Sequence, residues 1–209
     1  MSFEQFVGQC PLVAILRGLA PEEALGMGQC LIDSGFTMIE VPLNSPRPFE
    51  SISILQESFG RRALIGAGTV LSREAVDGVA AAGGKLIVMT HCNTDVISYA
   101  KSVGLYCVPG IATPTEAFAA LDAGADALKL FPAENAAPAV VKAMLAVLPK
   151  ATRILPVGGI APDNMADYWA AGAAGFGLGS ALYKPGMSTE QVGANARAFI
   201  EAIEALKQD

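Results

Sequence analysis

Short apolar runs alternate with longer stretches of helical periodicity from one end of the chain to the other. The short runs are rich in Val, Ile, Leu and Phe and end in Gly or Pro, which is typical of buried strands. Strands are predicted at 12–16, 36–43, 63–70, 85–89, 105–108, 127–132, 153–157 and 175–182. Helices are predicted at 48–59, 94–103, 113–123, 138–148, 162–171 and 189–207, with two more opening at Pro21 and Arg73.

Repeated strand–helix units joined by short links are typical of a closed parallel barrel. We therefore expect one α/β domain over residues 1–209, a (β/α)8 TIM barrel with a short N-terminal segment and a long C-terminal helix. A doubly wound open sheet is the alternative. That fold usually carries a glycine-rich fingerprint after its first strand, and residues 17–21 (Arg-Gly-Leu-Ala-Pro) are not one.

The amino-acid composition bears on which kinds of molecule the protein could bind. The 209 residues are 52% hydrophobic and 16% charged, with a net charge of −6. This balance predicts neither nucleic acid nor an anionic membrane as a partner, so an anionic ligand needs a local site. No apolar run is long enough to span a membrane, and residues 1–5 do not open a signal peptide.

The cysteines and the single histidine give little sign of a metal or cofactor. Cys10, Cys30, Cys92 and Cys107 form no CxxC pair, so reduced thiols in a cytoplasmic protein are expected. His91 stands beside Cys92 without a cluster of other ligands and is expected to be a loop residue. We expect no metal and no cofactor.

Lys129 interrupts the apolar strand predicted at 127–132. Burial disfavours the charged form of a lysine and makes a neutral, nucleophilic amine accessible. Such amines form Schiff bases with carbonyl substrates. The alternative is a strand-end lysine whose ammonium reaches water along its apolar stem.

Glu40 lies in another apolar strand and raises the same question. A buried carboxyl should be paired, protonated or functional. It could form a structural ion pair with Lys129, or it could act as the base beside a lysine imine, directly or through one water.

Other polar or small residues fall where predicted strands end, which is where active sites of barrels lie. Arg17 offers a planar fork for a carboxylate or phosphate, or could pair with an acid of a nearby loop. Gly66 and Gly68 allow close backbone approach, and Thr69 adds a hydroxyl that could instead cap the next helix.

Gly158-Gly159 ends the seventh predicted strand, and the eighth holds Gly177-Leu178-Gly179-Ser180. Glycines at these two strands expose backbone N–H groups in the usual phosphate pocket of this barrel. They therefore favour a phosphate site over ordinary turn glycines. Gly66-x-Gly68 lacks the third glycine of a dinucleotide fingerprint.

Over essentially its whole length the chain resembles the class I aldolases that cleave 2-keto-3-deoxy-6-phosphogluconate and 6-phosphogalactonate. The motifs that carry the resemblance are 13–18 (Val-Ala-Ile-Leu-Arg-Gly), 39–41 (Ile-Glu-Val), 66–71 (Gly-Ala-Gly-Thr-Val-Leu), 109–110 (Pro-Gly), 129–132 (Lys-Leu-Phe-Pro), 157–160 (Val-Gly-Gly-Ile) and 177–180 (Gly-Leu-Gly-Ser).

The resemblance implies a Schiff base at Lys129 and proton transfer by Glu40. It implies that Arg17 and Thr69 hold the carboxylate end of the substrate. The phosphate would be bound by Gly159, Gly179 and Ser180. Members of this family are typically homotrimers and need no metal.

One departure bears on the substrate. Gluconate-type enzymes usually carry Thr-Leu-Arg-Thr after the catalytic Glu-Val, whereas residues 42–46 here are Pro-Leu-Asn-Ser-Pro, which resembles the galactonate branch. Without that arginine, carboxylate binding depends more on Arg17. We therefore expect cleavage of 2-dehydro-3-deoxy-6-phosphogalactonate to pyruvate and D-glyceraldehyde 3-phosphate, with the gluconate epimer as the alternative.

Two further hypotheses keep the barrel but change its chemistry. A sugar-phosphate isomerase or epimerase would use Glu40 as a base and Lys129 only as an electrostatic partner. A non-catalytic barrel that binds a phosphorylated ligand would keep Glu40 and Lys129 as a silent core pair. A covalent adduct between Lys129 and pyruvate separates the aldolase from both.

Overall fold

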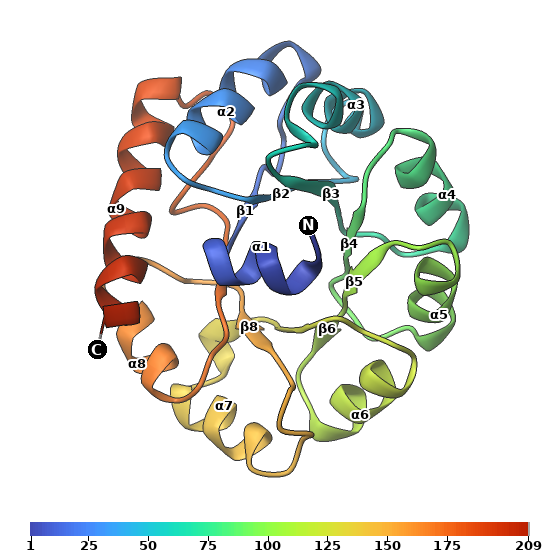
Figure 1. The fold of residues 1–209 in the computed structure, drawn as a ribbon, viewed down its shortest axis with the longest axis vertical. Helices are drawn as coiled ribbons and strands as arrows, with labels where there is room; N and C mark the ends of the chain where they lie inside the picture. The colour runs from blue at the N-terminus through green and yellow to red at the C-terminus, as the bar shows by residue number, and fades with distance from the viewer. Residues whose placement is uncertain (209) are drawn as a thin grey trace.

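The computed structural model describes residues 1–208, in which helices encircle a central group of parallel strands (Figure 1). The strands are β1 (Leu12–Ile15), β2 (Met38–Pro42), β3 (Leu64–Gly68), β4 (Leu86–Val88), β5 (Tyr106–Val108), β6 (Gly110–Ile111), β7 (Leu128–Leu130), β8 (Ile154–Pro156) and β9 (Phe176–Leu178). The helices are α1 (Phe3–Gln9), α2 (Pro21–Asp33), α3 (Pro48–Phe59), α4 (Arg73–Ala81), α5 (Thr94–Ser102), α6 (Pro114–Asp122), α7 (Pro138–Leu145), α8 (Met165–Ala170), α9 (Thr189–Gln208) and the 3₁₀ turn η1 (Ala133–Asn135).

Local sequence signals set where several of these helices begin. The side chains of Ser72, Asn93 and Thr113 accept hydrogen bonds from backbone N–H groups in the first turns of α4, α5 and α6. Helices α2, α3, α6 and α7 begin with proline, whose missing N–H costs nothing at that position. These signals therefore fix the first residues of the helices that they precede.

The prediction of a closed eight-stranded TIM barrel is wrong. The strands of the described chain form two separate hydrogen-bonded sheets. One has six strands in the order β5-β4-β3-β2-β1-β9, and the other has three in the order β6-β7-β8.

The break between the sheets has a local cause on each side. Pro109 has no backbone N–H to donate, and it divides the region of the fifth predicted strand into β5, which pairs with β4, and β6, which pairs with β7. On the other side, β8 and β9 belong to different sheets, and an isolated bridge joins Val157, directly after β8, to Gly177 of β9. Gly158, with φ of +111°, turns the chain away directly after that bridge.

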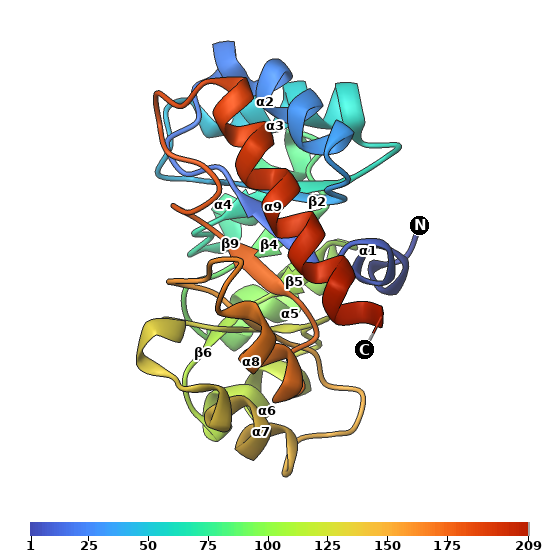
Figure 2. The same cartoon turned by 90° about the vertical axis from the view of Figure 1, so that its left-hand side faces the viewer.

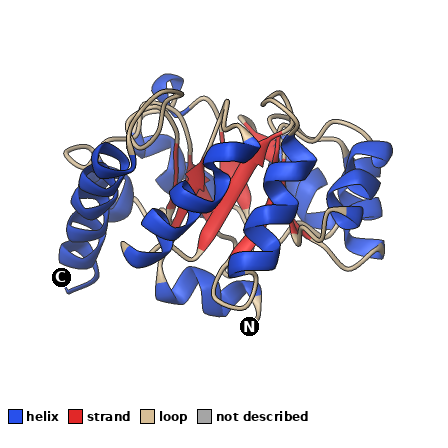
Figure 3. Cartoon of the chain, turned by 90° about the horizontal axis from the view of Figure 1, so that it is seen from above, coloured by secondary structure: helices blue, strands red, loops and turns tan. Residues whose placement is uncertain are grey.

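Side chains alternate between two apolar clusters along each strand. In β2, Ile39 and Val41 pack outward against the helices, whereas Met38 points inward with the second cluster. Phe3 and Phe6 of α1 belong to that inner cluster. In Figure 3, α1 lies below the central strands, so it covers one end of the interior and leaves the other end to carry the site.

The long helix α9 runs down one side of the molecule and ends near α1, so the two described chain ends lie on the same side (Figure 2). Lys207 donates a hydrogen bond to the backbone oxygen of Gln9, 2.9 Å away, and ties α9 to the end of α1. Within residues 1–208, no helix combines the length and the apolar character needed to cross a membrane.

Candidate active site

Lys129 is the middle residue of β7, between Leu128 and Leu130, and its side chain is 3% exposed. The two leucines pack outward against the helices, so strand alternation turns Lys129 toward the interior. Its Nζ lies 4.8 Å from the centroid of the Phe131 ring. The lysine is therefore buried in apolar surroundings.

Glu40 points into the same interior from β2 and is 1% exposed. Its Oε2 is buried without a hydrogen-bond partner in the described chain. A Cβ at position 68 would overlap the Glu40 carboxyl group, so Gly68 on the neighbouring strand β3 leaves the space that this carboxyl occupies. Gly66 has a different neighbour, since a Cβ at that position would overlap the backbone of Leu86 on β4.

A small cavity of about 10 Å³ is lined by both Glu40 and Lys129. That volume is close to the minimum for one water molecule. Among the described residues, the two charged groups form no ion pair, which would require nitrogen and oxygen within 4.0 Å. The alternative of a structural Glu40–Lys129 pair is therefore not what the structure contains.

Burial moves both groups toward their neutral forms. Burial raises the pKa of Glu40 to about 7, although the nearby charges of Lys129 and Arg17 oppose the rise. Burial lowers the pKa of Lys129, with the Glu40 carboxyl opposing the change and Arg17 adding to it. A carboxyl poised near neutrality and an amine that releases its proton readily are what acid–base and nucleophilic chemistry need.

Lys129 also borders a larger open cavity of about 560 Å³. Residues that follow the carboxyl ends of the strands line it, among them Arg17 after β1, Phe131 after β7, Gly158 and Gly159 after β8, and Gly179 and Ser180 after β9. Ile15, Lys129 and Val157 border both cavities. Lys129 thus borders both the open cavity and the small cavity that Glu40 lines.

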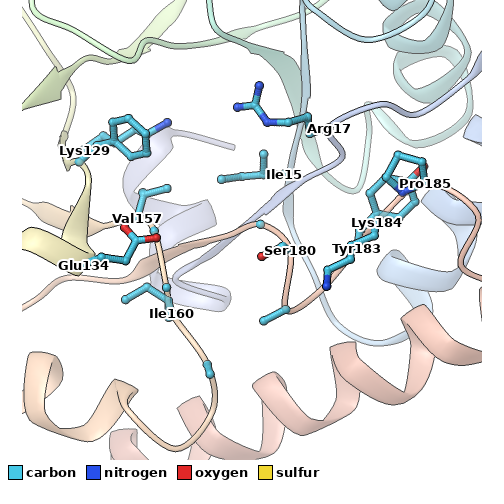
Figure 4. A pocket seen from close by; sticks show the side chains of 16 residues that line it. Ile15, Arg17, Lys129, Glu134, Val157, Ile160, Ser180, Tyr183, Lys184 and Pro185 are labelled. Carbon is cyan, nitrogen blue, oxygen red and sulfur yellow. The ribbon is translucent and has the colours of Figure 1, made fainter.

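Arg17 lies above this cavity, on the same side as Lys129 in Figure 4. Its Nη1 donates a hydrogen bond to Oδ1 of Asn44, 3.0 Å away. Among the described residues, Arg17 makes no ion pair with an acidic side chain, which was the alternative open from the sequence. The positive charge of the guanidinium is therefore available to an anionic ligand.

Thr69 is the predicted site residue that the structure leaves outside the cavity lining. It follows Gly68 with φ of +56°, a conformation uncommon for a residue other than glycine. It does not cap the next helix, because Ser72 Oγ accepts the hydrogen bond from the N–H of Ala75 at the start of α4.

The open cavity is lined by Gly158, Gly159, Gly179 and Ser180, whereas Gly177 borders the small cavity instead. Asn164 holds the turn after β8, since its side chain donates to the oxygen of Gly159 at 2.8 Å and accepts from the N–H of Ala161 at 3.1 Å. This turn and the start of the loop after β9 form a compact polar end to the cavity.

Two residues of the open cavity, Lys184 and Glu134, and the contact of Asn44 with Arg17 were not predicted from the sequence. Lys184 follows the eighth predicted strand and brings a second, exposed amine to the glycine end. Glu134 lies in η1, and its carboxyl covers Gly158 so closely that a side chain there would overlap it. Asn44 contacts Arg17. The position of Lys184 after a strand end was a usable signal, whereas the other two depend on loop geometry.

The four cysteines and His91 do not line the cavity that holds Lys129. Among the described residues, no group of three or more His, Cys, Asp or Glu side chains is arranged to hold a metal ion. The four cysteines are free thiols, and burial raises the pKa of Cys107 to about 12. His91 and Cys92 line a separate shallow cavity and do not border the one that holds Lys129.

Comparison with known proteins places this geometry in a family. Residues 3–201 match the family model described as KDPG and KHG aldolase. The chain is 48% identical to the 2-dehydro-3-deoxy-6-phosphogalactonate aldolase of Escherichia coli (strain K12), over 98% of this chain and 100% of that protein. It is 34% identical to the 2-dehydro-3-deoxy-phosphogluconate aldolase of Treponema pallidum (strain Nichols), over 76% of this chain and 73% of that protein.

A solved structure titled as native KDPGal matches the fold with a TM-score of 0.95 at 47% sequence identity, covering 96% of this chain and 98% of the other. The family model, the Escherichia coli relative and the solved structure thus match nearly the full length and confirm the resemblance seen in the motifs. The protein is therefore a member of the KDPG and KHG aldolase family.

Proposed function

We propose that the protein is a class I aldolase that cleaves 2-dehydro-3-deoxy-6-phosphogalactonate to pyruvate and D-glyceraldehyde 3-phosphate through a Schiff base on Lys129. The observation that carries the proposal is a buried amine, 3% exposed, beside a buried carboxyl to which it is not paired. In this environment the amine loses its proton readily and attacks a carbonyl carbon.

The reaction begins at the C2 ketone of the substrate. Lys129 Nζ adds to this carbon, and loss of water leaves a protonated imine. Glu40 takes the proton of the C4 hydroxyl, directly or through one water in the small cavity that it shares with Lys129. The C3–C4 bond then breaks, and its electron pair moves into the imine to form an enamine while the aldehyde leaves. Protonation at C3 and hydrolysis release pyruvate and restore the amine.

The two ends of the substrate bind different groups. Arg17 is assigned to the carboxylate next to the reacting carbon, because a planar guanidinium suits a carboxylate. The same assignment for Thr69 rests on the family resemblance alone, since Thr69 does not line the cavity. Gly159, Gly179 and Ser180 are assigned to the phosphate, where exposed backbone N–H groups act as donors. Lys184 brings an exposed amine to the same end of the cavity, and its positive charge supports placing the phosphate there.

The galactonate epimer is favoured over the gluconate epimer by the relatives and by the segment after Glu40. The relative named for the galactonate is 48% identical, and the one named for the gluconate is 34% identical. The test is a coupled assay of pyruvate release on both epimers. We expect a higher kcat/KM for the galactonate; a higher value for the gluconate would reverse the assignment, and turnover of neither would refute the function.

We further assign this aldolase to the cytoplasm, as a homotrimer. Free thiols at all four cysteines suit a reducing compartment. Large apolar side chains that stay exposed on the single chain, including Phe49, Leu71 and Phe118, suit burial between subunits. Light scattering after size-exclusion chromatography tests the oligomer: the expected mass is three times the chain mass of 21.5 kDa, and a monomer would contradict it.

A further inference from the structure

The loop after β1 is held from two sides. On one side, Gly18 N–H donates to Oγ of Ser45 at 2.9 Å, and Ser45 is buried. On the other side, Pro185 contacts Gly18 so closely that a Cβ there would lie 2.6 Å from Pro185 Cγ. Gly18 has φ of +86°, a conformation that suits glycine. The backbone that carries Arg17 is therefore fixed next to the cavity.

The side chain of Arg17 has one further constraint, its hydrogen bond to Asn44. The bond is 3.0 Å long and joins residues 27 positions apart in the sequence. Asn44 itself does not line the open cavity, whereas Arg17 does. Because an exposed arginine has many rotamers, a single partner that holds its guanidinium over the cavity reduces the entropy lost when an anion binds.

We propose that Asn44 is a positioning residue that holds the Arg17 guanidinium in the orientation that receives the carboxylate of the keto acid. This inference rests on the proposed function. Asn44 suits the task because its amide oxygen is neutral. It accepts one of the five N–H donors of Arg17, leaves the others for the ligand and does not cancel the positive charge. An aspartate would orient the guanidinium equally well but would neutralise it.

The test measures pyruvate binding apart from turnover. Enzyme is inactivated by borohydride at increasing pyruvate concentrations, which gives the half-saturating concentration and the maximal rate of trapping. In Asn44→Ala the half-saturating concentration should rise about two- to tenfold, the size of one hydrogen bond, with the maximal rate unchanged. Gln29→Ala, which removes an exposed side-chain hydrogen bond to Asp33 on α2, is the matched control and should leave both values unchanged.

A double-mutant cycle separates positioning from a general effect on the loop. In an Arg17→Ala background, Asn44→Ala should have no further effect on the half-saturating concentration. An equal rise with and without Arg17, or no rise at all, would overturn the proposal. Asn44→Asp should weaken pyruvate binding at least as much as Asn44→Ala; wild-type binding in Asn44→Asp would overturn the argument from neutrality.

The same data separate a failure of the proposed function from a failure of the role given to Asn44. If wild-type enzyme forms no trapped adduct, the proposed aldolase function is refuted. If the adduct forms but Arg17→Ala binds pyruvate as tightly as wild type, the function stands and the role of Asn44 is refuted.

Discussion

Lys129 and Glu40 border one small cavity from opposing strands without forming an ion pair. A purely structural pair of buried charges would be expected in direct contact, because each charge loses its hydration. Separation instead leaves the amine and the carboxyl free to take up and release protons independently. A substrate carbon bonded to the amine would then lie next to the carboxyl that moves its proton.

Replacement of Glu40 by glutamine should abolish proton transfer while keeping the shape of the side chain. We expect Glu40→Gln to lower the kcat of cleavage by roughly two to four orders of magnitude, the usual size of general acid–base catalysis. In the wild type, kcat/KM should fall as the pH drops below about 7, because the pKa of Glu40 is raised to about 7 by burial and the protonated carboxyl is no base. The measurement is a pH profile of pyruvate release for both proteins.

The exposed carboxyl of Glu201 on α9 provides the matched control. Glu201→Gln should keep both the rate and the acidic limb of the pH profile. If Glu40→Gln turns over close to the wild-type rate, or keeps the acidic limb of the wild-type pH profile, Glu40 is not the base.

Glu40→Gln should also make the ligand-free fold more stable than the wild type at pH 8. The folded-state pKa of Glu40, about 7, lies above its ordinary value of 4.5, so its protonated form stabilises the fold. That contribution is complete below pH 4.5 and is lost as the pH rises through 7. The free energy of unfolding of Glu40→Gln relative to wild type should therefore increase by up to about 3 kcal/mol between pH 4.5 and pH 8. Denaturant unfolding at both pH values measures it, and a difference that does not change with pH would contradict a buried, unpaired carboxyl.

Gly179 offers a direct test of the phosphate end. A Cβ there would meet no atom within 4 Å, and its φ lies outside the left-handed region, so alanine fits the fold. Because Gly179 lines the cavity, the new methyl group would project toward the bound phosphate. We expect Gly179→Ala to raise KM for the phosphorylated substrate by about tenfold, equivalent to about 1.4 kcal/mol, without changing the trapping of pyruvate.

Gly8 in α1 is the matched control, since a Cβ at that position also meets no atom within 4 Å. Gly8→Ala should leave KM unchanged. If Gly179→Ala also leaves it unchanged, the phosphate does not bind beside the loop after β9.

The inward orientation of the reacting pair could be predicted from the sequence. A charged residue inside a short apolar strand must face either solvent or a polar interior, and Lys129 and Glu40 both face the interior. The glycines after β8 and β9 also line one cavity, as strand-end placement suggested. These features depend on strand alternation, which is local, and on the general rule that parallel strands end at the same edge.

Features that depend on the pairing of distant segments were not predicted. The effect of Pro109 on closure of the sheet requires knowing which strands flank it. The contact between Arg17 and Asn44 joins two loops whose approach is set by the pairing of β1 with β2. The placement of Glu134 over Gly158 likewise results from the course of the loop after β7. Hydrophobic periodicity carries no information about such contacts.

The central claim, covalent chemistry at Lys129, is tested most directly by borohydride reduction in the presence of pyruvate, followed by peptide mass spectrometry. Lys184 is the rival amine, because it lines the same cavity but is exposed. We expect one stable adduct on Lys129, retained in Lys184→Met and lost in Lys129→Met. An adduct that persists in Lys129→Met, or none in the wild-type enzyme, would contradict the account.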